Sequence, residues 1–156
     1  MGLVAAPDLP FLLTESRATP MHVGGLQVFE LPPDAGPTWL RDQFEAMIAF
    51  DDISPLFRQR PYRSLATGMQ WAWREDDELD IEYHVRHSAL PEPGRVRELL
   101  ALGSRLHGTL LDRQRPLWEF HLIEGLQGNR FAAYTKVHHA MVDGVSALRL
   151  LERWLS

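Results

Sequence analysis

The sequence contains no cysteine. This absence excludes disulfide bonds, thiolate zinc sites, iron–sulfur clusters and a cysteine nucleophile. Lysine is nearly absent as well, because Lys136 is the single lysine among 16 basic residues. Since 21 acidic residues bring the net charge to -5, the chain lacks the basic footprint of a nucleic-acid-binding protein, and we expect no nucleic-acid partner.

Long apolar runs are also missing. No window approaches the roughly 18 apolar residues of a membrane-spanning helix. The first residues lack the charged start of a signal peptide, and Ala6 stands where a myristoylation signal has Ser or Thr. We therefore expect a cytoplasmic protein. Peripheral attachment to membranes or lipid inclusions stays open, because no predicted helix has a basic face strong enough to decide it.

What is present suits one globular domain. The 156 residues are 45% hydrophobic and 24% charged, which is enough apolar material for a core. Alternation of apolar residues predicts strands at 23–31, 69–73, 79–90, 117–125 and 130–138. A 3.6-residue period predicts a helix from Thr38 with Leu40, Phe44, Met47 and Ile48 on one face, a helix over 95–107 in which Val96, Leu99, Leu100, Gly103 and Leu106 keep the period, and a helix after Gly144. We also expect a helical turn near 11–15, a loop over 51–68, and a hairpin at the loop 126–129 between the last two strands. This order predicts an α+β two-layer sandwich with a mixed β-sheet.

The segment with the clearest chemistry joins the last strand to the last helix. It reads His138-His139, then three residues, then Asp143-Gly144. A histidine at a strand end can act as a general base, because its ordinary pKa lies near neutrality. The aspartate can return toward the imidazole or pair with an arginine, and Gly144 lets the backbone bend into the helix.

This segment resembles the His-His-x-x-x-Asp-Gly motif of the CoA-dependent acyltransferase superfamily. Two further segments, Thr-Pro-Met-His-Val-Gly-Gly at 19–25 and Asp-Arg-Gln-Arg-Pro-Leu-Trp-Glu at 112–119, resemble the N-terminal half of bacterial wax ester synthase/acyl-CoA:diacylglycerol acyltransferases. Tyr-His-Val-Arg at 83–86 fits as well. The resemblance covers residue 8 to the end, and it implies one lobe of a chloramphenicol-acetyltransferase-like two-lobe fold.

The resemblance implies acyl transfer from acyl-CoA to a long-chain alcohol or a diacylglycerol, with no permanently bound cofactor. His139 would be the general base, His138 a supporting residue and Asp143 a structural residue that holds the loop through an arginine. Two other readings stay open. One is a condensation-type enzyme with a carrier-bound acyl donor, and the other is an inactive lobe that only binds a partner.

The same resemblance makes residues 1–156 an N-terminal lobe. Family members are about three times as long, and their active site lies between two lobes. We therefore expect a C-terminal lobe as a partner and no transferase activity from residues 1–156 alone.

Two further residues are candidate substrate contacts. Trp118 could line an acyl tunnel, although an aromatic residue in a strand is more often core. His22 could approach the substrate channel, whereas Gly24 and Gly25 are more simply strand glycines that permit close packing.

We expect no metal site, because His84 and His87 on one strand would face opposite sides. An arginine cluster at 58–63 is most simply solvated surface, with CoA phosphates or lipid headgroups as the alternative.

Overall fold

The computed structural model describes residues 2–141, and its main element is a four-stranded mixed sheet. The strands run in the order β1 (His22–Glu30), β6 (Arg130–His138), β5 (Trp118–Leu126) and β4 (Val85–Ala89). β1 and β5 are antiparallel to β6, whereas β4 and β5 are parallel. The parallel pair needs a long crossover, and α4 (Val96–His107) supplies it. The α+β class and the mixed sheet predicted from the sequence are confirmed.

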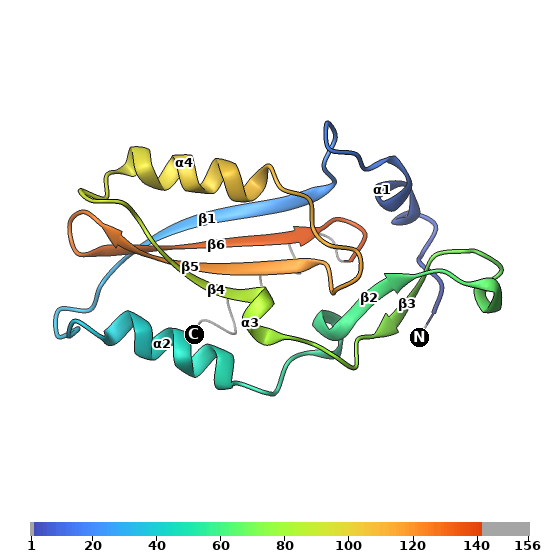
Figure 1. Cartoon of the computed structure of the whole chain (residues 1–156), viewed down its shortest axis with the longest axis horizontal. Helices are drawn as coiled ribbons and strands as arrows, with labels where there is room; N and C mark the ends of the chain where they lie inside the picture. The colour runs from blue at the N-terminus through green and yellow to red at the C-terminus, as the bar shows by residue number, and fades with distance from the viewer. Residues whose placement is uncertain (1, 142–156) are drawn as a thin grey trace.

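The two long helices pack on opposite faces of this sheet, one above and one below the strands in Figure 1. On α2 (Trp39–Ala49) the apolar face packs with Trp118, Phe120 and Leu122 of β5. On α4 the leucines pack with Ile123, Ala132 and Tyr134, which point the other way. A helix on each face adds a layer to the two expected. β5 and β6 are buried on both faces for the same reason.

The predicted apolar face of α2, which is Leu40, Phe44, Met47 and Ile48, is confirmed. The predicted face of α4 is wrong in part. Leu99, Gly103 and Leu106 lie against the sheet, but Val96 and Leu100 are about half exposed, and Leu102 packs instead. The reason is that one face of a helix spans only about 100°, and Leu102 falls inside it while the other two residues fall outside.

The β5–β6 hairpin is confirmed. Its loop places Gly128 at φ +81° and Asn129 at φ +54°, a left-handed conformation that glycine and asparagine adopt most readily. The short helical turn near residue 11 is also present as α1 (Leu9–Thr14).

Three local predictions are wrong. The predicted loop over 51–68 contains a 3-10 turn (Pro55–Arg58), a second one (Leu65–Thr67) and β2 (Gln59–Tyr62). Among residues 2–141, β2 pairs only with β3 (Ala72–Glu75), so Pro61 is tolerated at the edge of a two-stranded sheet. β3 also begins later than predicted.

The third error is in the segment predicted as a strand over 79–90. Its first half is a helical turn, α3 (Ile81–His84), before β4 begins. The Asp80 carboxylate accepts a hydrogen bond from Glu82 N–H at 3.1 Å and so caps the turn. His84 and His87 therefore do not share one strand as the metal argument assumed. The predicted last helix lies outside the described residues.

Between residues 2 and 141, no helix combines the length and apolarity that crossing a bilayer requires.

Candidate active site

The two adjacent histidines lie at the C-terminal end of β6, where the strand gives way to a turn. His138 N–H donates to Leu117 O of the chain entering β5, and His139 N–H donates to Met21 O just before β1. The backbone of the pair is thus held from both neighbouring strands. His138 is fully buried, whereas the side chain of His139 is partly accessible.

The ring of His138 bridges its own turn and a carboxylate from the N-terminal segment, which is residues 2–21 before β1. Its Nδ1 accepts a hydrogen bond from Ala140 N–H at 3.1 Å. The ring proton of the neutral imidazole therefore sits on Nε2, which lies 3.0 Å from Oε2 of Glu15. Burial lowers the pKa of His138, and the Glu15 charge offsets only part of that effect. His138 is thus a neutral, fixed ring inside the site.

Glu15 is itself almost entirely buried, and it has three partners. Oε2 also accepts from Met21 N–H at 2.9 Å, and Oε1 lies 3.3 Å from the Arg113 guanidinium, which donates to Leu12 O as well. Burial alone would raise the pKa of this carboxyl, but the Met21 N–H, His138 and Arg113 outweigh it and hold the pKa below its usual value. A buried carboxylate with this set of partners stays ionised.

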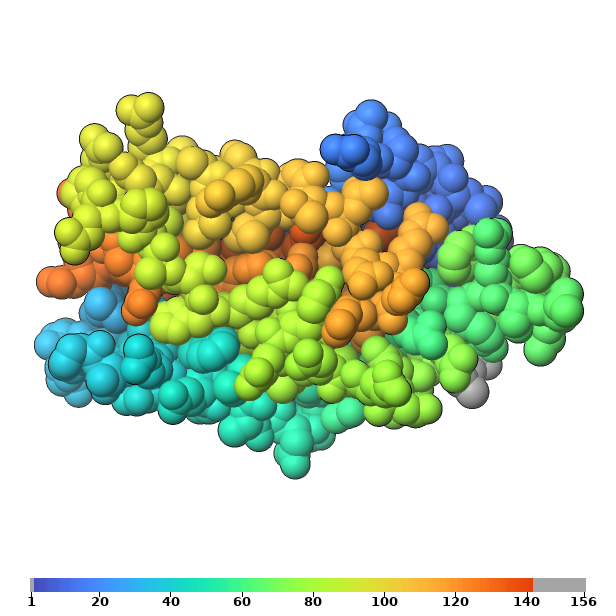
Figure 2. Space-filling view, viewed as in Figure 1, coloured from blue at the N-terminus to red at the C-terminus, as the bar shows by residue number. Residues whose placement is uncertain are grey.

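The ring of His139 stacks on Phe11 of α1, with centroids 4.9 Å apart and an interplanar angle of 21°. The N-terminal segment therefore supplies both the platform for His139 and the partner of His138. Figure 2 shows this segment (blue) against the segment that precedes β5 (orange). Arg113 of the second segment donates to Leu12 O of the first.

His22 faces the end of α4. It pairs across the strands with His138, and its Nε2 lies 2.6 Å from His107 O. Burial lowers the pKa of His22, so this ring is neutral and donates to the carbonyl. The ring of His107 meets His22 edge-on, and its Nδ1 lies 2.7 Å from the Tyr134 hydroxyl.

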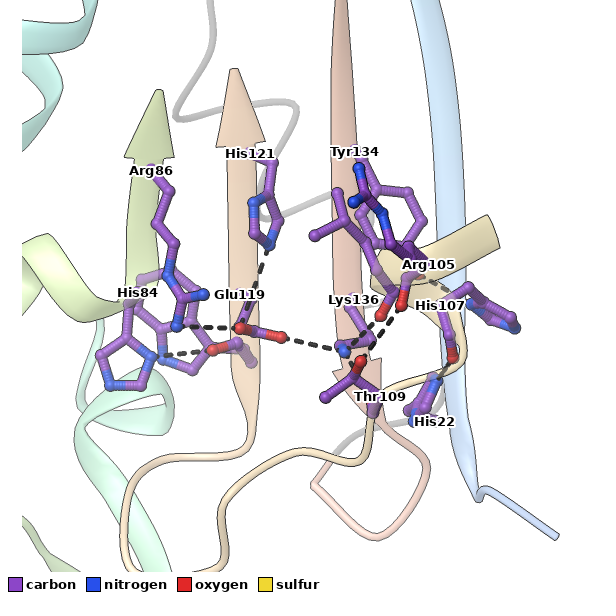
Figure 3. A network of polar contacts seen from close by, with 12 residues as sticks. His22, His84, Arg86, Arg105, His107, Thr109, Glu119, His121, Tyr134 and Lys136 are labelled. Atoms are coloured by element: carbon purple, nitrogen blue, oxygen red, sulfur yellow. Dashed lines mark hydrogen bonds and ion pairs between the residues drawn. The ribbon is translucent and has the colours of Figure 1, made fainter. Parts of the chain in front are cut away.

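An ionic group continues from there across the sheet, in which Lys136 and Glu119 are buried and Arg86 is partly exposed (Figure 3). The Lys136 ammonium donates to Leu106 O and Thr109 O at the end of α4, and it pairs with Glu119 at 3.0 Å. Arg86 pairs with the same carboxylate at 3.1 Å. This cluster satisfies the last carbonyls of α4 and thereby fixes the helix end on the sheet.

Trp118 lies in the core beside the ionic group. Its ring stacks on His84 at 4.6 Å, and its Nε1 donates to Phe57 O at 2.8 Å. His84 in turn lies 2.8 Å from Trp118 O through Nδ1. Trp118 is 1% exposed, so it is part of the core. Its contact with substrate stays a prediction.

An open groove of about 460 Å³ runs between β1 and the second half of α4. Its lining includes Gly24, Leu26, Leu100, Gly103, His107 and Tyr134. A Cβ on Gly24 would lie 2.6 Å from the Tyr134 hydroxyl and 2.7 Å from His107 Nδ1. The interpretation of Gly24 as a close-packing residue is confirmed.

The structure brings together His138, His139 and His22 of the predicted site residues and places Trp118 in the adjoining core. Asp143 and Gly144 lie outside the described residues. Among residues 2–141, no group of three or more histidine, aspartate or glutamate side chains is arranged so that it could hold a metal ion.

Three residues of the site were missed from the sequence, namely Phe11, Glu15 and Arg113. Two signals were available. Glu15 is a lone acid after an apolar stretch, and Arg113 lies inside the segment 112–119 that carried the resemblance. The contact between Glu15 and Arg113 joins residues 98 positions apart in the sequence, so no local pattern contains it.

A family model of the wax ester synthase/diacylglycerol acyltransferase catalytic domain matches residues 4–156. The chain belongs to the wax ester synthase/diacylglycerol acyltransferase family. It is 55% identical over its whole length to a protein of Mycobacterium tuberculosis named a probable diacylglycerol O-acyltransferase, of which it covers 34%. The chain thus spans about a third of the length of the curated relatives it matches.

Solved structures agree with the family. A wax ester synthase/diacylglycerol acyltransferase from Marinobacter aquaeolei is 46% identical and superposes with a TM-score of 0.91, over 98% of this chain and 36% of that one. The starter condensation domain of rhizomide synthetase, at 15% identity and a TM-score of 0.70, shares the fold over 99% of this chain and 36% of that domain. The chain accordingly has the fold of one lobe of these two-lobe proteins.

Proposed function

We propose that this chain is the N-terminal lobe of an acyl-CoA-dependent O-acyltransferase that acts on a long-chain alcohol or a diacylglycerol. The observation that carries the proposal is the position of His139. Its ring is accessible and stacked on Phe11, and its backbone is fixed between the ends of β1 and β6. Membership of the family supplies the substrate class.

In the proposed reaction His139 takes the proton of the acceptor hydroxyl. The acceptor oxygen attacks the thioester carbonyl of acyl-CoA, the new C–O bond forms, and the C–S bond breaks. The imidazolium then returns the proton to the departing CoA thiolate. No covalent enzyme intermediate is required, and general base action of this kind contributes about 10²–10⁴-fold to the rate.

The neighbours of His139 have different roles in this proposal. His138 is a supporting residue, since its ring is buried and neutral and both of its nitrogens face protein groups. Asp143 and Gly144 would shape the turn into the following helix. No permanently bound cofactor takes part, and acyl-CoA enters as a co-substrate.

The proposal also includes a second lobe. The chain covers about a third of its relatives, and two substrates as large as acyl-CoA and a lipid alcohol need more surface than one lobe provides. We propose that a C-terminal lobe completes the acceptor and CoA sites, so residues 1–156 alone are inactive. Because the acceptor is a lipid, the proposal includes transient contact of the protein with membranes or lipid inclusions.

The test is turnover of palmitoyl-CoA with hexadecanol or dioleoylglycerol by the protein assembled with its C-terminal lobe. We expect His139→Ala to lower kcat by about 10²–10⁴-fold. His87→Ala is the matched control, because His87 lies on β4 away from the turn, and it should keep full turnover. Unchanged turnover in His139→Ala would refute the general-base assignment.

A second comparison tests the donor. The condensation-type alternative from the sequence analysis has a carrier-bound acyl group as its donor. We expect free palmitoyl-CoA to support turnover and palmitoyl-acyl carrier protein not to. The reverse result would assign the chain to condensation-type chemistry. No turnover with either donor from the assembled and folded protein would favour an inactive partner-binding lobe.

A further inference from the structure

The N-terminal segment ends in one carboxylate that holds the histidine turn from two sides. A single oxygen, Oε2 of Glu15, lies 2.9 Å from Met21 N and 3.0 Å from His138 Nε2. Met21 begins the approach to β1, and His138 ends β6. The oxygen therefore ties together the starting end of one strand and the finishing end of its neighbour.

Both links continue to His139. From Met21 the link runs through the same residue's carbonyl, which accepts the His139 N–H at 2.9 Å. From His138 it runs through Nδ1, which accepts the Ala140 N–H at 3.1 Å. The peptide groups on either side of the His139 Cα are thus each held through groups that contact Glu15.

The carboxylate is in turn held in place. Arg113 pairs with Oε1 at 3.3 Å, donates to Leu12 O, and lies over the Trp71 ring at 5.5 Å from its centroid. A tight turn returns the chain from Glu15 toward Met21, since Ser16 and Thr19 exchange both backbone hydrogen bonds. With the Glu15 side chain 3% exposed, neither water nor substrate competes for these contacts.

We propose that Glu15 is a positioning residue of the transfer reaction, which sets the place of His139 through Met21 and His138 without touching substrate. The proposal rests on the proposed role of His139 as the general base. A general base must lie within hydrogen-bond reach of the hydroxyl it deprotonates, and a misplacement of about 1 Å can cost about 10²-fold in rate. A buried charged residue with no direct access to substrate should therefore affect kcat and leave KM alone.

The first variant is Glu15→Gln, which keeps the size of the side chain but turns one acceptor oxygen into a donor. In the assembled protein we expect kcat to fall about 10–100-fold, with the KM for palmitoyl-CoA and for the alcohol within twofold of the parent. Glu98→Gln is the matched control, because Glu98 makes the same kind of ion pair with Arg95 on the surface of α4. It should leave kcat unchanged.

A second readout does not depend on activity. In the assembled protein, hydrogen–deuterium exchange of the His139 and Ala140 amides should be about tenfold faster in Glu15→Gln. The double variant Glu15→Gln/His138→Asn should lose no more kcat than the worse single variant, because the His138 link is one of the two links that depend on Glu15. Losses that multiply would show independent roles and would overturn the proposal.

The outcomes separate this proposal from the proposed function. If His139→Ala abolishes turnover while Glu15→Gln keeps the parent kcat, the positioning role is wrong and the general base stands. If His139→Ala keeps turnover, the proposed function itself fails. Should Glu15→Gln not yield folded protein, Glu15→Asp keeps the charge and shortens the reach by one methylene. A folded Glu15→Asp with the parent kcat would overturn the proposal, and a tenfold loss of kcat at unchanged KM would support it.

Discussion

The imidazole of His139 lies nearly parallel to the ring of Phe11, 4.9 Å away, although one follows the last strand of the sheet and the other belongs to the first helix. Stacking of this kind restricts the ring to one orientation and covers one of its faces. The turn that holds His139 and the N-terminal segment are therefore packed together as one structural unit.

Removal of this platform should impair catalysis more than stability. We expect Phe11→Ala to lower kcat about tenfold in the assembled protein, because the His139 ring gains orientations that do not reach the acceptor. Leu13→Ala on the same short helix is the control, since Leu13 is 62% exposed and its loss should leave kcat unchanged. Steady-state kinetics of both variants gives the answer. Equal kcat values in the two variants would argue against the platform role.

Gly24 should be intolerant of even one methyl group. In Gly24→Ala the new Cβ would lie 2.6 Å from the Tyr134 hydroxyl and 2.7 Å from His107 Nδ1, so the hydrogen bond between those two groups must break or shift. We expect a loss of about 1–3 kcal/mol in the free energy of unfolding, measured by urea denaturation. Gly36→Ala has open space around its Cβ and should be neutral or slightly stabilising. A neutral Gly24→Ala would contradict the close contact.

Lys136 should contribute strongly to stability, because its ammonium is buried at the end of α4. Lys136→Met removes the donor for Leu106 O and Thr109 O. It also removes the ion pair that Lys136 makes with the buried Glu119 carboxylate. We expect the free energy of unfolding to drop by about 3–5 kcal/mol. The control Arg97→Met, on the exposed side of α4, should stay within about 0.5 kcal/mol of the parent.

A double variant sharpens that test. Glu119→Gln added to Lys136→Met removes the unbalanced charge, so it should recover part of the lost stability. A double variant less stable than Lys136→Met would mean that Arg86 alone is a sufficient partner for Glu119.

The stability of the chain should fall as the pH drops below about 6.5. Burial lowers the pKa of four histidines, His22, His84, His121 and His138, and it lowers that of His121 to about 4. In the unfolded chain these rings bind protons below their ordinary pKa of 6.5, whereas the folded chain excludes the protons. Each such ring therefore favours unfolding by about 1.4 kcal/mol per pH unit between its two pKa values.

Urea denaturation at pH 7, 6 and 5 measures this slope. His121→Gln should reduce the slope of the free energy of unfolding against pH by the contribution of one proton, because glutamine does not titrate. A free energy of unfolding that stays level or rises between pH 6.5 and 5 would show that the buried histidines are already protonated in the fold.

Much of the scaffold followed from patterns that a few neighbouring residues contain. The Gly-Asn turn defined the β5–β6 hairpin, and apolar residues at helical spacing defined α2 and α4. Such features depend on local backbone preferences and on burial of one face, so they can be read along the chain. The position of the adjacent histidines at the end of β6 could also be predicted, since it follows from the strand and the turn beside it.

Tertiary structure alone decided what surrounds those histidines. Glu15 meets His138, and Arg113 meets Glu15, only because the sheet brings the starting end of β1 beside the finishing end of β6. Likewise the single lysine reaches the end of α4 only because the helix crosses the face toward which Lys136 points. Contacts between distant segments depend on how the whole chain closes, and they leave no periodic trace in the sequence. The sequence therefore pointed to the adjacent histidines as the candidate site, and the fold determined which residues hold them in place.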